Sequence, residues 1–187
     1  EAGLESDGLK LFQIKCLHYK DFSPENVRKA IDELERLMEE IRTRPEEEGS
    51  DLIEPSDLER ELAILYWDLD LPQKALEIVD DYLENYPETS GILQLKADIL
   101  ARENRHEEAL ETCRKLIETE PKNLHYRLKL GNCYERLENT DKALECYRMI
   151  LMENCNFVPA IRRLMYIYSY LSNERRDLGL CKKGIEY

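Results

Sequence analysis

The stretch "NTDKALECYR" (Asn139–Arg148) contains a tripeptide that recurs at a fixed step along the chain. Ala-Leu-Glu begins at residues 75, 109 and 143, so successive copies lie 34 residues apart. A period of about 20–50 residues is the signature of proteins built from stacked, repeated structural units. When the repeated Ala is numbered 20 in a 34-residue frame, the frames begin at residues 56, 90, 124 and 158.

Each frame contains two helix-length segments separated by a short polar break, and the third frame shows this most clearly. Leu130, Tyr134 and Leu137 are spaced i, i+4, i+7, which places them on one face of a helix. The break "RLENTD" follows, and Asn139 to Asp141 supply the turn and the helix cap. The second segment carries its own apolar stripe, made of Ala143, Leu144, Tyr147, Ile150 and Leu151. The pattern predicts two antiparallel helices per frame.

Small residues recur at two positions of the frame. Position 8 holds Ala63, Ala97 and Gly131, and position 20 holds the repeated Ala. Small side chains allow two helices to approach closely, so we expect Ala143 to lie against Gly131. Position 32 holds Pro87 and Pro121, which are expected to end the second helix because proline cannot continue it.

These features together resemble the tetratricopeptide repeat (TPR) family, and "LKLGNCYERLENTDKALECYRMIL" (residues 128–151) matches its pattern best. The resemblance implies an all-α fold, a right-handed α-solenoid of antiparallel helix pairs forming a TPR superhelix. It covers residues 56–187, in frames 56–89, 90–123, 124–157 and 158–187. The fourth frame has Met165 and Asp177 where small residues belong, so we expect it to pack differently or to act as a degenerate cap.

Residues 1–45 do not fit the frame and are interpreted as an N-terminal helix pair, a divergent TPR. Helices are predicted near residues 6–20 and 24–42, the second capped by Ser23 with Pro24 at its first position. Residues 46–55 then form an acidic connection to the array.

Composition and the lack of known motifs argue against several classes of function. The chain carries 27 basic and 40 acidic side chains, a net charge of −13, which disfavours binding to nucleic acid. It has no apolar run near the roughly 18 residues that a membrane helix needs. Six Cys without a C-x-x-C pair indicate reduced thiols in an intracellular protein, cytoplasmic or nuclear, with no metal site. No catalytic or phosphate-binding motif is present, so neither an enzyme nor a cofactor is expected.

The resemblance implies a concave groove lined by the first helix of each repeat, at frame positions 2, 5, 9, 12 and 13. Arginine and aromatic residues at such positions are typical of protein interfaces, so we expect a protein or peptide segment with acidic groups as partner. A clamp for chaperone C-terminal tails would need Lys at position 5 followed by Asn at position 9, and no frame has this pair. The candidate groove residues are Arg60, Ile64, Trp67, Asp98, Arg102, Leu128, Asn132, Arg136, Arg162, Tyr166 and Tyr170.

Other interpretations of these residues stay open. Asp98–Arg102 and Asn132–Arg136 are i, i+4 pairs that could simply stabilise their own helices, and Tyr166 and Tyr170 could belong to the core. TPR proteins also bind partners on outer faces and edges.

Two functional hypotheses follow. The first is an adaptor or scaffold that binds a partner segment in the groove. The second is a structural segment of a longer α-solenoid docked within a multisubunit complex, because the chain starts without Met and "LGLCKKGIEY" has no clear polar capping helix. The second hypothesis includes self-association through the C-terminal end. The sequence does not identify the partner or the pathway.

Overall fold

The computed structural model describes residues 7–20, 23–43 and 54–174, with side chains up to Leu171. Every secondary-structure element in this part of the chain is an α-helix, which confirms the all-α prediction. The aromatic-rich stretch "LMYIYSYL" (residues 164–171) lies within a helix, Val158–Glu174. The helices are α1 (Asp7–Tyr19), α2 (Pro24–Thr43), α3 (Pro55–Asp68), α4 (Pro72–Asn85), α5 (Ser90–Arg102), α6 (His106–Thr119), α7 (Leu124–Arg136), α8 (Thr140–Glu153) and α9 (Val158–Glu174).

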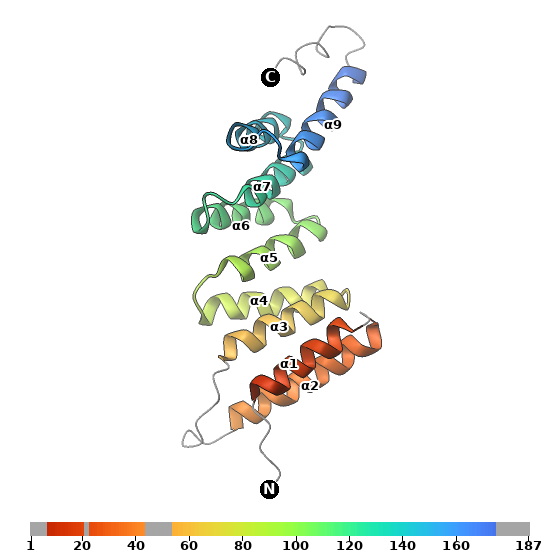
Figure 1. Ribbon diagram of the computed structural model, residues 1–187, viewed down its shortest axis with the longest axis vertical. Coiled ribbons are helices and arrows are strands. Elements are labelled where there is room, and N and C mark those ends of the chain that lie inside the picture. Colours follow the sequence, from red (N-terminus) through yellow and green to blue (C-terminus); the bar gives the residue numbers. More distant parts are fainter. Residues whose placement is uncertain (1–6, 21–22, 44–53, 175–187) are drawn as a thin grey trace. The chain divides into compact units, whose positions relative to one another are not determined.

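The chain forms two compact units, residues 1–99 and residues 100–187. In the first unit α1 packs beside α2, α2 beside α3 and α3 beside α4 (Figure 1). Ala30, Leu34 and Leu37 of α2 and Leu58 and Leu65 of α3 are buried in one hydrophobic core. Both predicted N-terminal helices are present, and the Ser23 hydroxyl accepts a hydrogen bond from the Asn26 amide, 3.2 Å away. The acidic connection lies outside the described residues except for Glu54 and Pro55.

Polar side chains also join α1 to α3. The buried His18 lies with Nε2 2.7 Å from Oδ2 of Asp68. Lys15 forms an ion pair with the buried carboxylate of Glu61, at 3.1 Å. Because hydrogen bonds to charged groups need defined geometry, these two pairs fix how α1 lies on α3.

The polar breaks inside the frames fold into the same turn three times. Asp70, Asn104 and Glu138, spaced 34 residues apart, have φ angles of 61°, 60° and 58°. In each turn the amide one residue later donates to a carbonyl five residues back, as Asn139 does to Tyr134 at 2.9 Å. This is the Schellman motif, which normally places glycine at the left-handed position. The three turns therefore share one backbone geometry, although none of them contains glycine.

In the second unit α6 packs beside α7, α7 beside α8 and α8 beside α9. One contact recurs between successive repeats. Arg114 donates to the Tyr134 hydroxyl at 3.2 Å, and Arg148 donates to the Tyr168 hydroxyl at 2.7 Å. Both arginines hold frame position 25 and both tyrosines hold position 11 of the next frame. The same interface is therefore used twice.

The small residues of the frame are buried, and one of them faces an aromatic ring. Ala63, Ala97 and the three repeated alanines are buried. The open side of Gly131 faces the ring of Tyr147: a Cβ added at Gly131 would lie 2.6 Å from the ring carbon Cε1. The glycine therefore makes room for this ring, whereas its expected contact with Ala143 stays a prediction.

Helix ends follow the frame even where proline is missing. Asn85 ends α4 two residues before Pro87, and Thr119 ends α6 two residues before Pro121. Glu153 ends α8 at the matching place, although position 32 there is Cys155. Proline is therefore not required to stop this helix.

The fourth frame is described only through its first helix, α9, and Asp177 lies outside the described residues. Met165 is 67% exposed, whereas the small residues at its frame position in earlier repeats are buried. No described helix is long and apolar enough to cross a membrane.

Candidate protein-binding surface

The eleven candidate residues are divided between the two units. Arg60, Ile64, Trp67 and Asp98 belong to the first unit, and the other seven belong to the second. In the first unit the Arg60 guanidinium donates to Asp57 on its own helix at 3.2 Å, and Ile64 and Trp67 are half-buried. A groove that continues through all frames remains a prediction, so the two sets are considered separately.

Three candidates of the second unit form an exposed stripe on α9. Arg162, Tyr166 and Tyr170 are spaced i, i+4, i+8, and the two tyrosines are 57% and 56% exposed. The alternative that these tyrosines belong to the core is therefore wrong. Two large aromatic side chains beside an exposed guanidinium are the residue types most enriched at the energetic centres of interfaces.

The candidates on α7 have three different environments. Leu128 is partly buried against the core of α8 and α9, and Arg136 is exposed at the end of the helix. Asn132 lies between them, with Oδ1 2.8 Å from the Tyr147 hydroxyl. The structure thus engages Asn132 with a tyrosine of α8, an arrangement that the i, i+4 pattern with Arg136 did not indicate.

A charged cluster next to these residues joins α7 to α9. Arg163 forms a two-pronged ion pair with Glu135, with Nε 3.1 Å from Oε2 and Nη2 2.6 Å from Oε1. The Arg163 guanidinium also lies 5.5 Å from the ring centre of Tyr166, within cation–π range. Arg163 therefore holds α9 against α7 and supports one of the exposed aromatic rings.

Tyr147 of α8 is the third member of this cluster. Its hydroxyl lies 3.0 Å from Oε2 of Glu135, and its side chain is fully buried. Burial raises the pKa of Tyr147 above its ordinary value; the hydrogen bond to Arg163 opposes the rise and the Glu135 charge adds to it. The hydroxyl stays protonated and has one hydrogen, so it donates to either Glu135 or Asn132 at a given moment.

The roles of Glu135, Tyr147 and Arg163 in this cluster were not predicted from the sequence. A tyrosine at position 24 facing the glycine at position 8 was a usable signal for the buried ring. The ion pair between Arg163 and Glu135 could not be predicted from the sequence, because Arg162 and Arg163 are adjacent and only the fold decides which of them faces α7. Within the described part of the chain, no group of three or more His, Cys, Asp or Glu side chains is placed to hold a metal ion.

The paired helices, the repeated turns and the recurrent contact between repeats agree with comparisons to known proteins. The family model of the Psidin N-terminal TPR repeats region matches residues 59–173. The chain belongs to this TPR family. The TPR assignment derived from the 34-residue frame is thereby confirmed.

Similar proteins include one curated relative and several solved TPR structures. The uncharacterized protein y4yS of Sinorhizobium fredii is 39% identical over 66 residues, which is 34% of this chain and 36% of that protein. The chain thus matches little more than a third of that relative.

The structural neighbours share the fold at low sequence identity. YrrB, a TPR protein with an unusual peptide-binding site, is 19% identical with a TM-score of 0.66, covering 85% of this chain and 74% of YrrB. MamA from Desulfovibrio magneticus is 13% identical with a TM-score of 0.69, covering 89% of this chain and 88% of MamA. Both comparisons confirm the TPR fold, whose general use is as a protein–protein interaction scaffold.

Proposed function

We propose that this chain is an adaptor that binds a segment of a partner protein on the face formed by α7 and α9. This face, called the α7–α9 face, consists of Leu128, Asn132, Arg136, Arg162, Tyr166 and Tyr170. The observation that carries the proposal is the exposed stripe of Arg162, Tyr166 and Tyr170 on α9.

The charges of this face select the chemistry of the partner. Arg136 and Arg162 are exposed, and neither forms an ion pair within the described ranges, whereas Arg163 is already held by Glu135. Two available guanidinium groups on a chain of net charge −13 favour a carboxylate-bearing segment at this place. The tyrosine rings supply apolar area for large side chains between those carboxylates.

The cluster of Glu135, Arg163 and Tyr147 holds two residues of the face in place. An interface of side chains held before binding loses less conformational entropy when the partner arrives. Tyr166 is held by its contact with Arg163, and Asn132 by its contact with Tyr147. This supports recognition by a preformed surface.

The test is a quantitative affinity purification from cell extract with the full chain, read by mass spectrometry. The variant Arg136→Glu/Arg162→Glu is compared with wild type and with the control Arg28→Glu/Lys122→Glu. Both control positions are exposed, neither is a candidate residue, and both receive the same change of charge.

The proposal expects one set of proteins to be lost, by about tenfold or more, from the first variant and to be retained by the control. Circular dichroism must show that both variants keep the helical content of wild type. Equal recovery by both variants would exclude the α7–α9 face as the binding site.

A constitutive structural role is the second candidate. The exposed Met165, at a position that is small and buried in the earlier repeats, favours docking of α9 against another protein surface. Light scattering of the purified chain decides whether that surface is a second copy. A dimer that Met165→Glu converts to a monomer would support self-association, and a monomeric wild type would exclude it.

A further inference from the structure

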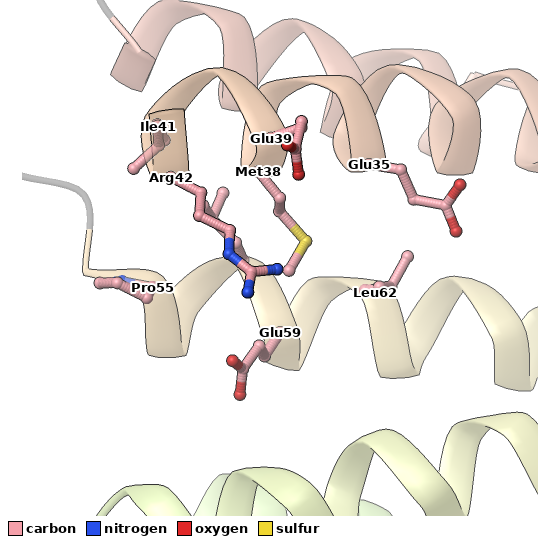
Figure 2. Close-up of a pocket in the computed structure, with 9 residues that line it drawn as sticks. Glu35, Met38, Glu39, Ile41, Arg42, Pro55, Glu59 and Leu62 are labelled. Carbon is pink, nitrogen blue, oxygen red and sulfur yellow. The ribbon is translucent and has the colours of Figure 1, made fainter. Parts of the chain in front are cut away.

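A separate pocket lies in the first unit, between α2 and α3 (Figure 2). Its volume is about 530 Å³, which suits one or two large side chains or a small ligand. None of the eleven candidate groove residues lines it, so it is a different surface from the one predicted by the repeat frame.

The floor of the pocket is apolar and continuous with the core. Leu58 and Leu62 of α3 are buried core residues, and Met38 and Ile41 of α2 are half-buried beside them. In Figure 2 the Met38 side chain points from α2 into the space above α3. A large apolar side chain placed here would therefore contact core residues directly, and its removal from water would favour binding.

The charged groups around this floor are mostly acidic. Glu35, Glu39 and Glu59 line the pocket together with a single guanidinium, that of Arg42. Glu35 accepts a hydrogen bond from Tyr66 at 2.8 Å, which fixes its carboxylate at one end. In Figure 2 the Glu59 carboxylate points away from α2, so it adds charge to the region rather than a direct contact.

The charge of the lining points to a cationic occupant. Even without Glu59, the carboxylates of Glu35 and Glu39 outnumber the single guanidinium of Arg42, on a chain that is itself strongly acidic. Glu35 and Glu39 are both exposed and line the pocket, so a cation on an occupant can pair with either of them.

We propose that the α2–α3 pocket binds a segment of a partner protein in which large apolar side chains are flanked by lysine or arginine. The apolar side chains fill the space over Met38 and Leu58, and the flanking cations pair with Glu35 and Glu39. This partner chemistry is opposite in charge to the one proposed for the α7–α9 face. The chain would then hold two different segments on two separate surfaces.

The experiment uses the full chain labelled with ¹³C on its methionine methyl groups. The chain has four methionines: Met38 in the pocket, and Met149, Met152 and Met165 in the second unit. Three synthetic peptides serve as probes: KKLFKK, its acidic counterpart EELFEE, and KKSSKK, which has the charge without the apolar pair. Each is titrated while the methyl resonances are recorded.

The proposal expects KKLFKK to shift the Met38 resonance saturably, with the other three resonances unchanged. EELFEE and KKSSKK should leave Met38 in place. Glu39→Lys should weaken KKLFKK binding by about tenfold, whereas Glu33→Lys, an exposed residue of the same helix outside the pocket, should weaken it by less than about twofold.

Several results would overturn the proposal. They are no Met38 shift with KKLFKK, an equal shift with EELFEE, or an equal loss of binding in Glu33→Lys and Glu39→Lys. Shifts confined to Met149, Met152 and Met165 would place the peptide in the second unit instead. The absence of a Met38 shift would leave the α7–α9 face open, because that face is tested with variants of Arg136 and Arg162.

Discussion

Replacement of Gly131 by alanine tests whether the Tyr147 ring determines the packing of α7 on α8. An added Cβ would lie 2.6 Å from Cε1, 3.0 Å from Cζ and 3.1 Å from Cδ1 of Tyr147, closer than carbon atoms pack. The ring is fully buried and its hydroxyl lies within hydrogen-bond distance of Asn132 and Glu135. It cannot withdraw without weakening these hydrogen bonds.

Two opposing effects set the magnitude of the change. Alanine is preferred over glycine inside a helix by about 1 kcal/mol, which by itself would stabilise the variant. Overpacking a core costs about 1–3 kcal/mol, and loss of a hydrogen bond to a charged group costs about 1.5–3 kcal/mol. Since the ring relieves the clash only by giving up hydrogen bonding, the two costs overlap in part. We expect the unfolding free energy to fall by about 2 kcal/mol.

Urea unfolding followed by far-ultraviolet circular dichroism measures this change. Gly91→Ala is the matched control, because Gly91 also lies in a helix and a Cβ added there meets no atom within 4 Å. The control should be neutral or slightly more stable than wild type. In a Tyr147→Leu background, Gly131→Ala should cost nothing, because the smaller side chain leaves room. A Gly131→Ala protein as stable as wild type would refute the role given to the ring.

Three further predictions concern other features of the fold. Burial and the hydrogen bond to Glu35 raise the pKa of Tyr66 to about 12, so Tyr66 keeps its proton in the folded chain while the unfolded chain loses it near the ordinary value of 10. Its contribution to stability should be complete below pH 10 and be lost as pH rises towards 12. A spectrophotometric titration of Tyr66→Phe should show one fewer tyrosine that ionises near pH 12 than the titration of wild type. Burial raises the pKa of Cys146 to about 11, so iodoacetamide at pH 8 should alkylate the exposed Cys155 and leave Cys146 unmodified in native protein; equal modification, read by mass spectrometry, would contradict this. Glu138→Gly should raise the unfolding free energy by about 0.5–1 kcal/mol, because glycine adopts the left-handed turn conformation without strain, and a lower urea midpoint would argue against strain there.

The sequence predicted the helices well because their positions depend on local and periodic features. The 34-residue spacing placed the paired helices of the array, and Ser23 with Pro24 located the start of α2. The predicted N-terminal helix pair agrees with α1 and α2 within one residue at each end. The left-handed turns at Asp70, Asn104 and Glu138 were not predicted, since none of these residues is glycine.

The candidate surface was less predictable, because it depends on contacts between residues far apart in the sequence. The exposed stripe of Arg162, Tyr166 and Tyr170 follows from helical spacing once α9 is known. The pairing of Arg163 with Glu135 joins residues 28 positions apart, and no local pattern encodes it. The α2–α3 pocket arises where a helix outside the frame meets the first helix of the array, so the repeat pattern carried no information about it.

The central claim is that a partner segment binds on the α7–α9 face. Its most direct measurement is photo-crosslinking from this face, with a benzophenone amino acid placed at position 166 or 170 of the full chain in cells. Position 118, an exposed site on α6, is the control. The account predicts that one protein is crosslinked from positions 166 and 170 but not from 118, and that Arg136→Glu/Arg162→Glu abolishes the crosslink. Crosslinks equally frequent from position 118, or unaffected by the two substitutions, would contradict it.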